Sequence, residues 1–329
     1  MLSFIMRRTL LGLLTIWIIS IIAFLVILLP PGDFVDAYIA QISATGGYVS
    51  TETAASLREQ YGTGKPFHVQ YIKWVKRVLQ GDFGQSLEFR VPVKEVIGDR
   101  LWLTMAVSIG AILLTWGLAL PIGIYSAVNQ YSAGDYFFTF IGFIGLAIPN
   151  FLLALILMYV GFKYFDASIG GLFSPEYVLE PWSWEKLWDM IKHLPLPVII
   201  LGMSGTAQLV RIMRANLLDE LRKPYVVTAR AKGLTETRVI LKYPVRAALN
   251  PFASTIGYLL PYVVSGSIII SVVMSLPTVG PILLRALVAQ DVYLAGTIIL
   301  MLGALTVIGT IFSDLLLMWI DPQIRLEQR

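Results

Sequence analysis

Long runs of apolar residues alternate with polar stretches along this chain of 329 residues. Six of the runs are long enough to cross a hydrocarbon core about 30 Å thick as helices that rise about 1.5 Å per residue. Their approximate limits are residues 1–29, 101–127, 137–162, 194–210, 252–274 and 293–317. The pattern predicts an all-α membrane protein with six transmembrane helices.

The polar stretches indicate how these spans are oriented. Arg7 and Arg8 precede the main part of the first run, and residues 211–250 carry nine Lys or Arg residues against three acids. Basic residues beside membrane spans favour the cytoplasmic side, so we expect both termini and residues 211–250 to be cytoplasmic. The first run is too long for the core of a signal peptide and has no small-x-small cleavage site before Pro30. We therefore expect it to remain as a span.

The same pattern divides the chain into parts. Residues 1–30 are expected to form an N-terminal transmembrane helix and residues 31–99 an extracytoplasmic segment. Within that segment, residues 66–79 have apolar positions at helical spacing, and Gly81 to Gly84 end the pattern, so a small helical segment is predicted outside the membrane. Residues 100–320 are expected to form a core of five transmembrane helices, with residues 321–329 as a cytoplasmic tail.

Composition argues against catalytic chemistry in this chain. Charged residues make up 14% of it, against roughly 25% in a soluble domain. Cysteine is absent, which excludes disulfides, thiolate metal sites and cysteine nucleophiles. His68 and His193 have no metal-ligand spacing, and residues 62–65 lack the Ser or Thr that follows Lys in a phosphate-binding loop. We predict no catalytic, cofactor-binding or metal site, and no enzymatic activity.

A few residues stand out within the spans. Asp314 is an acid inside the last run, about two turns or roughly 10 Å before Asp321, and intramembrane acids are candidate functional residues. This shallow position favours a bundle-facing or interfacial residue with a structural partner over a proton carrier. Pro121, Pro149 and Pro261 lie within spans, where the kinks they produce can serve as pivots.

The basic segment from Tyr225 to Pro251 carries further local signals. Pro224 suits the first turn of a helix, and Gly233 suits a left-handed helix end. Thr235 can cap a second helix that runs to about Tyr243. The segment therefore predicts two short helices at an angle, carried below the membrane. These signals leave open whether the segment docks on a partner or is a solvated loop attracted to anionic lipid.

The residue sequence of this segment is more specific evidence for its role than its charge and helix signals. Residues 228–234 read Thr-Ala-Arg-Ala-Lys-Gly-Leu and residues 246–251 read Arg-Ala-Ala-Leu-Asn-Pro. Together they resemble the cytoplasmic coupling loop of ABC importer permeases, in the form used by the oligopeptide/dipeptide family. Further stretches resemble that family's landmarks in order, so that the resemblance covers nearly the whole chain: residues 65–74, 81–86, 145–151, 277–280 and 314–322.

Two positions depart from the family pattern. The broader importer signature has Glu-Ala-Ala where this chain has Val227, Thr228 and Ala229, although peptide-type members often lack that glutamate. Thr278 stands where the family commonly has a second glycine, which affects the expected geometry of an outer loop.

The resemblance implies a type I ABC importer permease fold and assigns roles to named residues. Residues 211–250 become a coupling loop that contacts an ATPase, and Pro149, Pro261, Pro277 and Gly280 become candidate hinge or gate residues. The residues expected to couple to the ATPase are Tyr225, Thr228, Ala229, Arg230, Ala231, Lys232, Gly233, Leu234, Glu236 and Arg238.

The implied function is that of a permease subunit in a bacterial ABC importer of the cytoplasmic (inner) membrane, working by ATP-driven alternating access. The implied partners are a second permease, two cytoplasmic ATPases that bind ATP and Mg²⁺, an extracytoplasmic solute-binding protein and membrane lipid, with no nucleic acid. Oligopeptides or dipeptides are the first expected substrates. Oligosaccharides, opines, nickel chelates and glutathione are alternatives. A scaffold or receptor that uses the basic loop is the alternative of another class.

Overall fold

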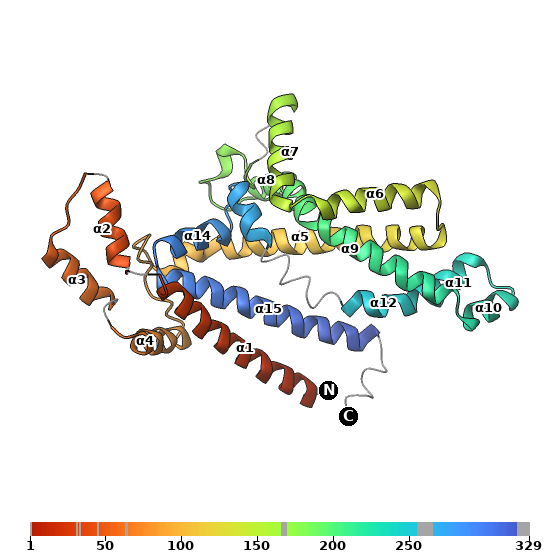
Figure 1. Ribbon diagram of the computed structural model, residues 1–329, viewed down its shortest axis with the longest axis horizontal. Helices are drawn as coiled ribbons and strands as arrows, with labels where there is room; N and C mark the ends of the chain where they lie inside the picture. The colour runs from red at the N-terminus through yellow and green to blue at the C-terminus, as the bar shows by residue number, and fades with distance from the viewer. Residues whose placement is uncertain are drawn as a thin grey trace. The chain divides into compact units, whose positions relative to one another are not determined.

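A computed structural model describes residues 2–30, 32, 34–44, 46–62, 65–165, 170–254 and 266–320 of the chain (Figure 1). Helices account for nearly all regular structure in these ranges, with one short 3₁₀ turn at Pro175–Tyr177. No strand occurs in the same ranges, where Gln85 and Pro92 form an isolated antiparallel bridge. The predicted all-α class is confirmed.

Four single helices are long and apolar enough to cross a membrane: α1 (Leu2–Leu28), α5 (Val93–Val128), α9 (Pro195–Leu221) and α15 (Val292–Ile320). A bent pair, α6 (Ala133–Ala147) and α7 (Asn150–Phe165), makes a fifth if it counts as one span. The remaining predicted span, residues 252–274, lies partly outside the described residues, since 255–265 with Pro261 are not described. Residues 266–273 are helical, as that prediction requires.

The break between α6 and α7 corrects one sequence expectation. Residues 137–162 were expected to form one span, whereas the chain bends by 103° between the two helices. Pro149 disfavours helical backbone in the residue before it, and Ile148 is accordingly extended, with φ −91° and ψ 120°. The expected kink at Pro149 is thus confirmed, and it is sharper than a pivot within one continuous helix.

The chain divides into two compact units, whose boundaries fall inside α5 and α15 and after Pro277. One unit comprises residues 6–103 and 278–307. It contains most of α1 together with α2 (Phe34–Ala44), α3 (Thr51–Tyr61), α4 (Phe67–Leu79), α14 (Val279–Val288) and the beginnings of α5 and α15. The predicted helix over residues 66–79 is confirmed as α4. Its Trp74 is buried with its ring centroid 5.6 Å from that of Phe24.

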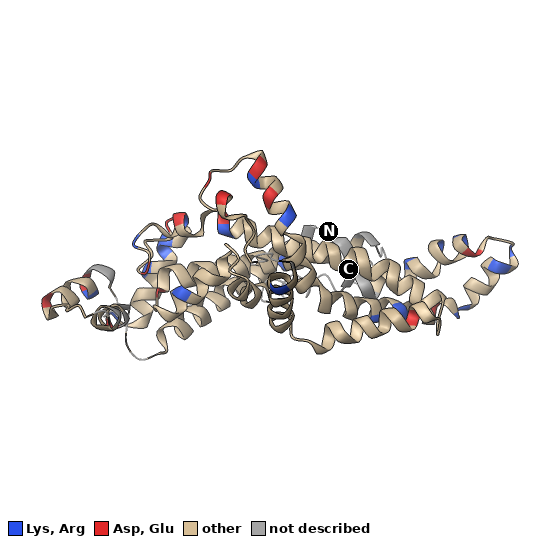
Figure 2. Ribbon diagram, turned by 90° about the horizontal axis from the view of Figure 1, so that it is seen from above, with Lys and Arg blue, Asp and Glu red and all other residues tan. Residues whose placement is uncertain are grey.

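The second unit comprises residues 1–5, 104–277 and 308–329. It holds α6, α7, α8 (Trp184–His193) and α9, and then three short helices, α10 (Pro224–Ala231), α11 (Glu236–Lys242) and α12 (Pro244–Ser254). Both α6 and α12 pack along α9. Charged side chains gather in the short helices and connections, and the long helices carry few (Figure 2). A buried cluster joins α5, α9, α11 and α12 through Ala119, Ala127, Leu209, Met213, Leu217, Ile240, Val245 and Ala248.

Candidate functional site

The two short helices predicted after residue 223 are present as α10 and α11, which extend beyond the end of α9 (Figure 1). Pro224 occupies the first turn of α10, where its missing N–H costs no hydrogen bond. Gly233 has φ +74° directly after the C-cap Lys232, and a Cβ added there would meet nothing within 4 Å. The glycine is therefore required for the left-handed backbone and not for space.

Thr235 precedes α11 with extended backbone, at the N-cap position that its sequence predicted. Its side chain makes no capping hydrogen bond within the described chain. The bend between α10 and α11, residues 224–242, is held instead by a small apolar core. Val226, Ala229 and Val239 form this core, and Leu234 and Tyr243 pack against it. Ala229 and Leu234, both expected to couple to a partner, thus contribute to the interior of the bend.

An ion pair closes the same bend from outside. The guanidinium of Arg230 donates to the carboxylate of Glu236, with distances of 3.0 Å from Nε to Oε2 and 2.6 Å from Nη2 to Oε1. The hydrogen bond from Arg230 lowers the pKa of Glu236 below its ordinary value. Both side chains are exposed, so solvent screens the pair and it stabilises the bend only weakly.

Most of the expected coupling residues lie on the surface of the bend. Tyr225, at the start of α10, donates a hydrogen bond from its hydroxyl to Oε2 of Glu220 at the end of α9. Burial, together with the carboxylate of Glu220, raises the pKa of Tyr225 above its ordinary value. The other exposed members of the expected set are Thr228, Arg230, Ala231, Lys232, Gly233, Glu236 and Arg238.

The bend is anchored to the membrane helices through apolar contacts. Ile240 of α11 and Val245 of α12 belong to the same buried cluster as Leu209 and Met213 of α9. Because interiors are close-packed, a displacement of α10 and α11 will be passed to α9 rather than absorbed by free space. The arrangement can therefore transmit force between the exposed surface of the bend and a long helix.

The candidate hinge and gate residues are spread over the chain. Pro149 lies at the bend between α6 and α7, and Pro277 is the last residue before the boundary between the two units. Gly280 is buried in α14, and Pro261 lies outside the described residues. Asp314 is partly buried in the last part of α15. Pro149 and Asp314 belong to neither of the apolar clusters that hold the bend.

The sequence analysis missed a buried ion pair within the membrane helices. Asp135, near the start of α6, is 2% exposed and accepts hydrogen bonds from Arg214 of α9 at 3.0 Å from Nε and 2.8 Å from Nη2. The backbone N–H of Tyr131 also donates to Asp135, at 2.9 Å. An arginine close to the end of a predicted span is a signal that a partner acid is needed nearby.

A second buried acid was also missed. Asp291 is fully buried before α15, and its Oδ2 accepts hydrogen bonds from the Ser86 hydroxyl at 2.6 Å and from the backbone N–H groups of Leu87 at 2.7 Å and Glu88 at 3.0 Å. Its Oδ1 caps α15 by accepting from the Leu294 N–H at 3.0 Å. Burial raises the pKa of Asp291 despite these hydrogen bonds. An Asp directly before a long apolar run was the available signal for this cap.

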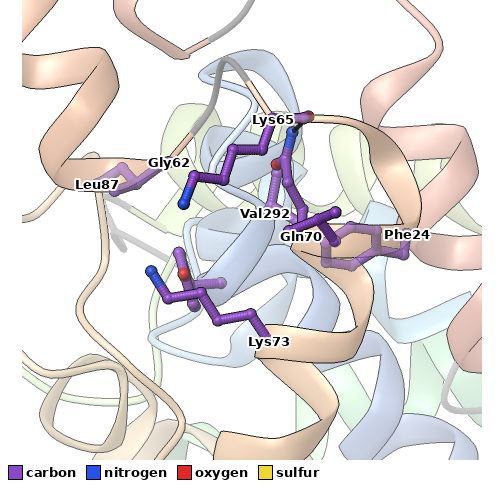
Figure 3. Close-up of a pocket in the computed structure, with 9 residues that line it drawn as sticks. Phe24, Gly62, Lys65, Gln70, Lys73, Leu87 and Val292 are labelled. Atoms are coloured by element: carbon purple, nitrogen blue, oxygen red, sulfur yellow. Dashed lines mark hydrogen bonds between the residues drawn. The ribbon is translucent and has the colours of Figure 1, made fainter.

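Two hollows lie in the unit that contains α4. The first has a volume of only about 20 Å³, room for one water molecule, and the ammonium ends of Lys65 and Lys73 point to the same side of it (Figure 3). The second is about 480 Å³ and is lined by Lys73, Arg77 and Asp82 among others. By the predicted topology both belong to the extracytoplasmic side.

No group of three or more His, Cys, Asp or Glu side chains suited to a metal ion occurs in the part of the chain that the structure describes.

Comparisons with known proteins match the chain along almost its whole length. The family model described as "Binding-protein-dependent transport system inner membrane component" matches residues 119–326, and the model of the N-terminal part of such membrane components matches residues 1–108.

Individual relatives are similar over nearly their full lengths. The oligopeptide transport system permease protein AppB of Bacillus subtilis is 33% identical over 330 residues, covering 98% of this chain and 99% of the relative. The dipeptide transport system permease protein DppB of Alkalihalophilus pseudofirmus is 30% identical, covering 99% of this chain and all of the relative. The glutathione transport system permease protein GsiC of Salmonella typhimurium is 32% identical, covering 99% of each chain.

Proposed function

Since this chain belongs to the family of binding-protein-dependent transport system inner membrane components, we propose that it moves oligopeptides or dipeptides across the cytoplasmic membrane by ATP-driven alternating access. Family membership makes it an ABC importer permease, a multi-pass inner-membrane subunit that works with other transport subunits. The observation that carries the mechanism is the α10–α11 bend, which has an exposed face and an apolar anchor on α9.

In this mechanism the bend is the contact with a cytoplasmic ATPase. The exposed side chains of Tyr225, Thr228, Ala231 and Lys232 meet the ATPase, while Val226 and Val239 hold the bend rigid from inside. Closure of two ATPases around ATP displaces the bend, and the cluster around Met213 passes the movement to α9 and α5. ATP and Mg²⁺ are held by the partner subunits. In this chain, residues 62–65 lack the Ser or Thr of a phosphate-binding loop.

The remaining partners follow from the same proposal. A second permease completes the pathway, and an extracytoplasmic solute-binding protein delivers the substrate. Both termini lie in the cytoplasm, as the basic residues 211–250 favour. The names of the relatives support peptides as the substrate class, because they include an oligopeptide, a dipeptide and a glutathione permease. Glutathione is itself a small peptide.

Reconstitution tests both parts of this proposal. The complex isolated from its native membrane through a tag on this chain is placed in proteoliposomes, and ATP hydrolysis and the uptake of labelled peptides and oligosaccharides are measured. We expect ATP-dependent peptide uptake and hydrolysis stimulated by the peptide-loaded binding protein. Uptake of an oligosaccharide in place of peptides would overturn the substrate class. Isolation of the chain without an ATPase would overturn the coupling role.

A further inference from the structure

A cavity of about 320 Å³ lies between α6 and α9, which pack along each other (Figure 1). It is separate from the α10–α11 bend, and no residue of that bend lines it. Its lining changes from charged to apolar along α6. Asp135 lies at one end and Leu146 at the other, eleven positions or about 16 Å apart along the helix.

The charged end carries a cation that no described residue neutralises. Asp135 and Arg214 satisfy each other through two hydrogen bonds of 3.0 and 2.8 Å. Arg211, one turn earlier on α9, also lines the cavity, is exposed, and makes no ion pair with any described residue. With one acid and two arginines, this end of the cavity has a net charge of +1.

The depth of Arg211 matches a membrane boundary. It lies sixteen residues after the start of α9, roughly 24 Å along a helix that must cross a core about 30 Å thick. Tyr131 and Tyr136 line the same end and are 68% and 62% exposed, the exposure and residue type that are common at membrane interfaces. By contrast, Phe143 and Leu146 place the apolar end at hydrocarbon depth.

We propose that this cavity binds an anionic phospholipid. The headgroup phosphate is recognised by Arg211, and one acyl chain lies over Phe143 and Leu146. A free phosphate or a soluble phosphate ester would leave the apolar end exposed, whereas a lipid covers both ends. Basic pockets between transmembrane helices on the cytoplasmic side are suited to such headgroups. A lipid held here contacts α9, the helix that leads into the α10–α11 bend, and the proposal does not depend on the transported substrate.

Lipid retention by matched variants tests the proposal. The full chain, in the complex in which it is isolated, is exchanged into nanodiscs of phosphatidylcholine doped with phosphatidylglycerol, and retained lipid is measured by native mass spectrometry. We expect Arg211→Gln to weaken retention of phosphatidylglycerol roughly tenfold, about 1.4 kcal/mol. Arg222→Gln removes the same charge from the end of the same helix and should retain the lipid as the wild type does.

A second variant tests the acyl part of the site independently of charge. Leu146→Trp should fill the apolar end of the cavity and displace phosphatidylglycerol while Arg211 remains. Equal retention by wild type and Arg211→Gln would overturn the headgroup contact, and full retention by Leu146→Trp would overturn the acyl contact. Absence of phosphatidylglycerol from the wild-type complex would overturn the proposal. Displacement by soluble glycerol phosphate as effective as displacement by lipid would show that the site is not a lipid site.

Discussion

Single residues determine the shape of the surface on which the proposed coupling depends. Gly233 supplies a backbone conformation that is strained by roughly 1–2 kcal/mol in most other residues. Its N–H donates to the carbonyl of Arg230 at 2.9 Å, which ends α10. Proline at this position can provide neither the positive φ nor the N–H.

We therefore expect Gly233→Pro to abolish substrate-stimulated ATP hydrolysis while membrane insertion and the yield of folded chain stay near those of the wild type. Gly81→Pro is the matched control, because Gly81 has φ +77° and also donates its N–H to a carbonyl three residues earlier, at the end of α4. Stimulated hydrolysis is measured in proteoliposomes. Wild-type stimulation in Gly233→Pro would contradict the coupling role, and loss of stimulation in both variants would show that the effect is not specific to the bend.

Asp291 shows how much one buried carboxylate can organise. Three donors converge on its Oδ2 and a fourth binds Oδ1. In Asp291→Asn the new amide N–H₂ must face at least one of these donors, which loses its acceptor. Each buried donor left without an acceptor costs about 1–3 kcal/mol.

We expect Asp291→Asn to lower the thermal unfolding midpoint in detergent by several degrees. Ser86→Ala leaves the acid paired with three N–H groups but also removes the acceptor of the Phe89 N–H, which lies 3.1 Å from the Ser86 hydroxyl. Because that N–H is only partly buried, we expect a smaller effect than in Asp291→Asn. An unchanged midpoint in Asp291→Asn would contradict the role assigned to this network.

At the scale of helices, the important features are the α10–α11 bend and the break between α6 and α7. On the bend, Val226, Ala229 and Val239 are buried while most other positions are exposed, so one surface is free for a partner. Ala231 is exposed beside Gly233, and Thr237 is exposed on α11 outside the set of expected coupling residues.

Substituting arginine at each of these two positions tests whether a partner docks on one specific face of the bend or on its surface in general. We expect Ala231→Arg to reduce co-purification of the ATPase severalfold and to reduce stimulated hydrolysis with it, because the longer side chain blocks close approach. Thr237→Arg adds the same side chain and should change neither quantity. Equal effects of both substitutions would show that charge, and not the face, decides the result.

The break at Pro149 offers a second test at the scale of helices. In Pro149→Ala the residue before position 149 is free to become helical. The 103° bend between α6 and α7 can then decrease. We expect longer distances between spin labels placed on α6 and α7, and slower uptake. Pro121→Ala is the control, because the helix continues through Pro121 and the non-helical backbone of α5 lies at Gly98 instead. The chain has no cysteine, so labels can be placed singly or in pairs without background. Straightened helices with normal uptake would refute a hinge role.

The sequence predicted well those features that neighbouring residues determine. Pro224, Gly233 and Thr235 act locally, and α10 and α11 begin and end as these residues predicted. The two buried acids meet partners far along the chain. Arg214 and Asp291 each stand at a position with a local signal, but no local pattern reveals which residues pair with them. Arg214 and Asp135 are 79 residues apart, and Ser86 and Asp291 are 205 apart. Only folding brings these charges and donors together.

At the scale of the whole molecule, two of the boundaries between the compact units fall inside α5 and α15, so the chain passes from one unit to the other along helices. The proposed topology places α3 outside and the α10–α11 bend inside the cell. Single cysteines at Thr51 and Thr235 test this arrangement, because both positions are exposed. A membrane-impermeant thiol reagent applied to intact spheroplasts should label Thr51→Cys only, and should label Thr235→Cys after lysis. Labelling of both before lysis would refute the topology.

The network around Asp291 also has a consequence for biogenesis. The donors at Ser86, Leu87 and Glu88 are synthesised about two hundred residues before their acceptor. In the proposed topology this loop is extracytoplasmic, and it cannot reach its final form while the ribosome is still elongating the middle of the chain. It closes only when the segment before the last helix has been translocated. A chain truncated before residue 291 should therefore leave this loop open to the proteases that survey the outer face of the membrane, so one carboxylate can report whether synthesis was completed.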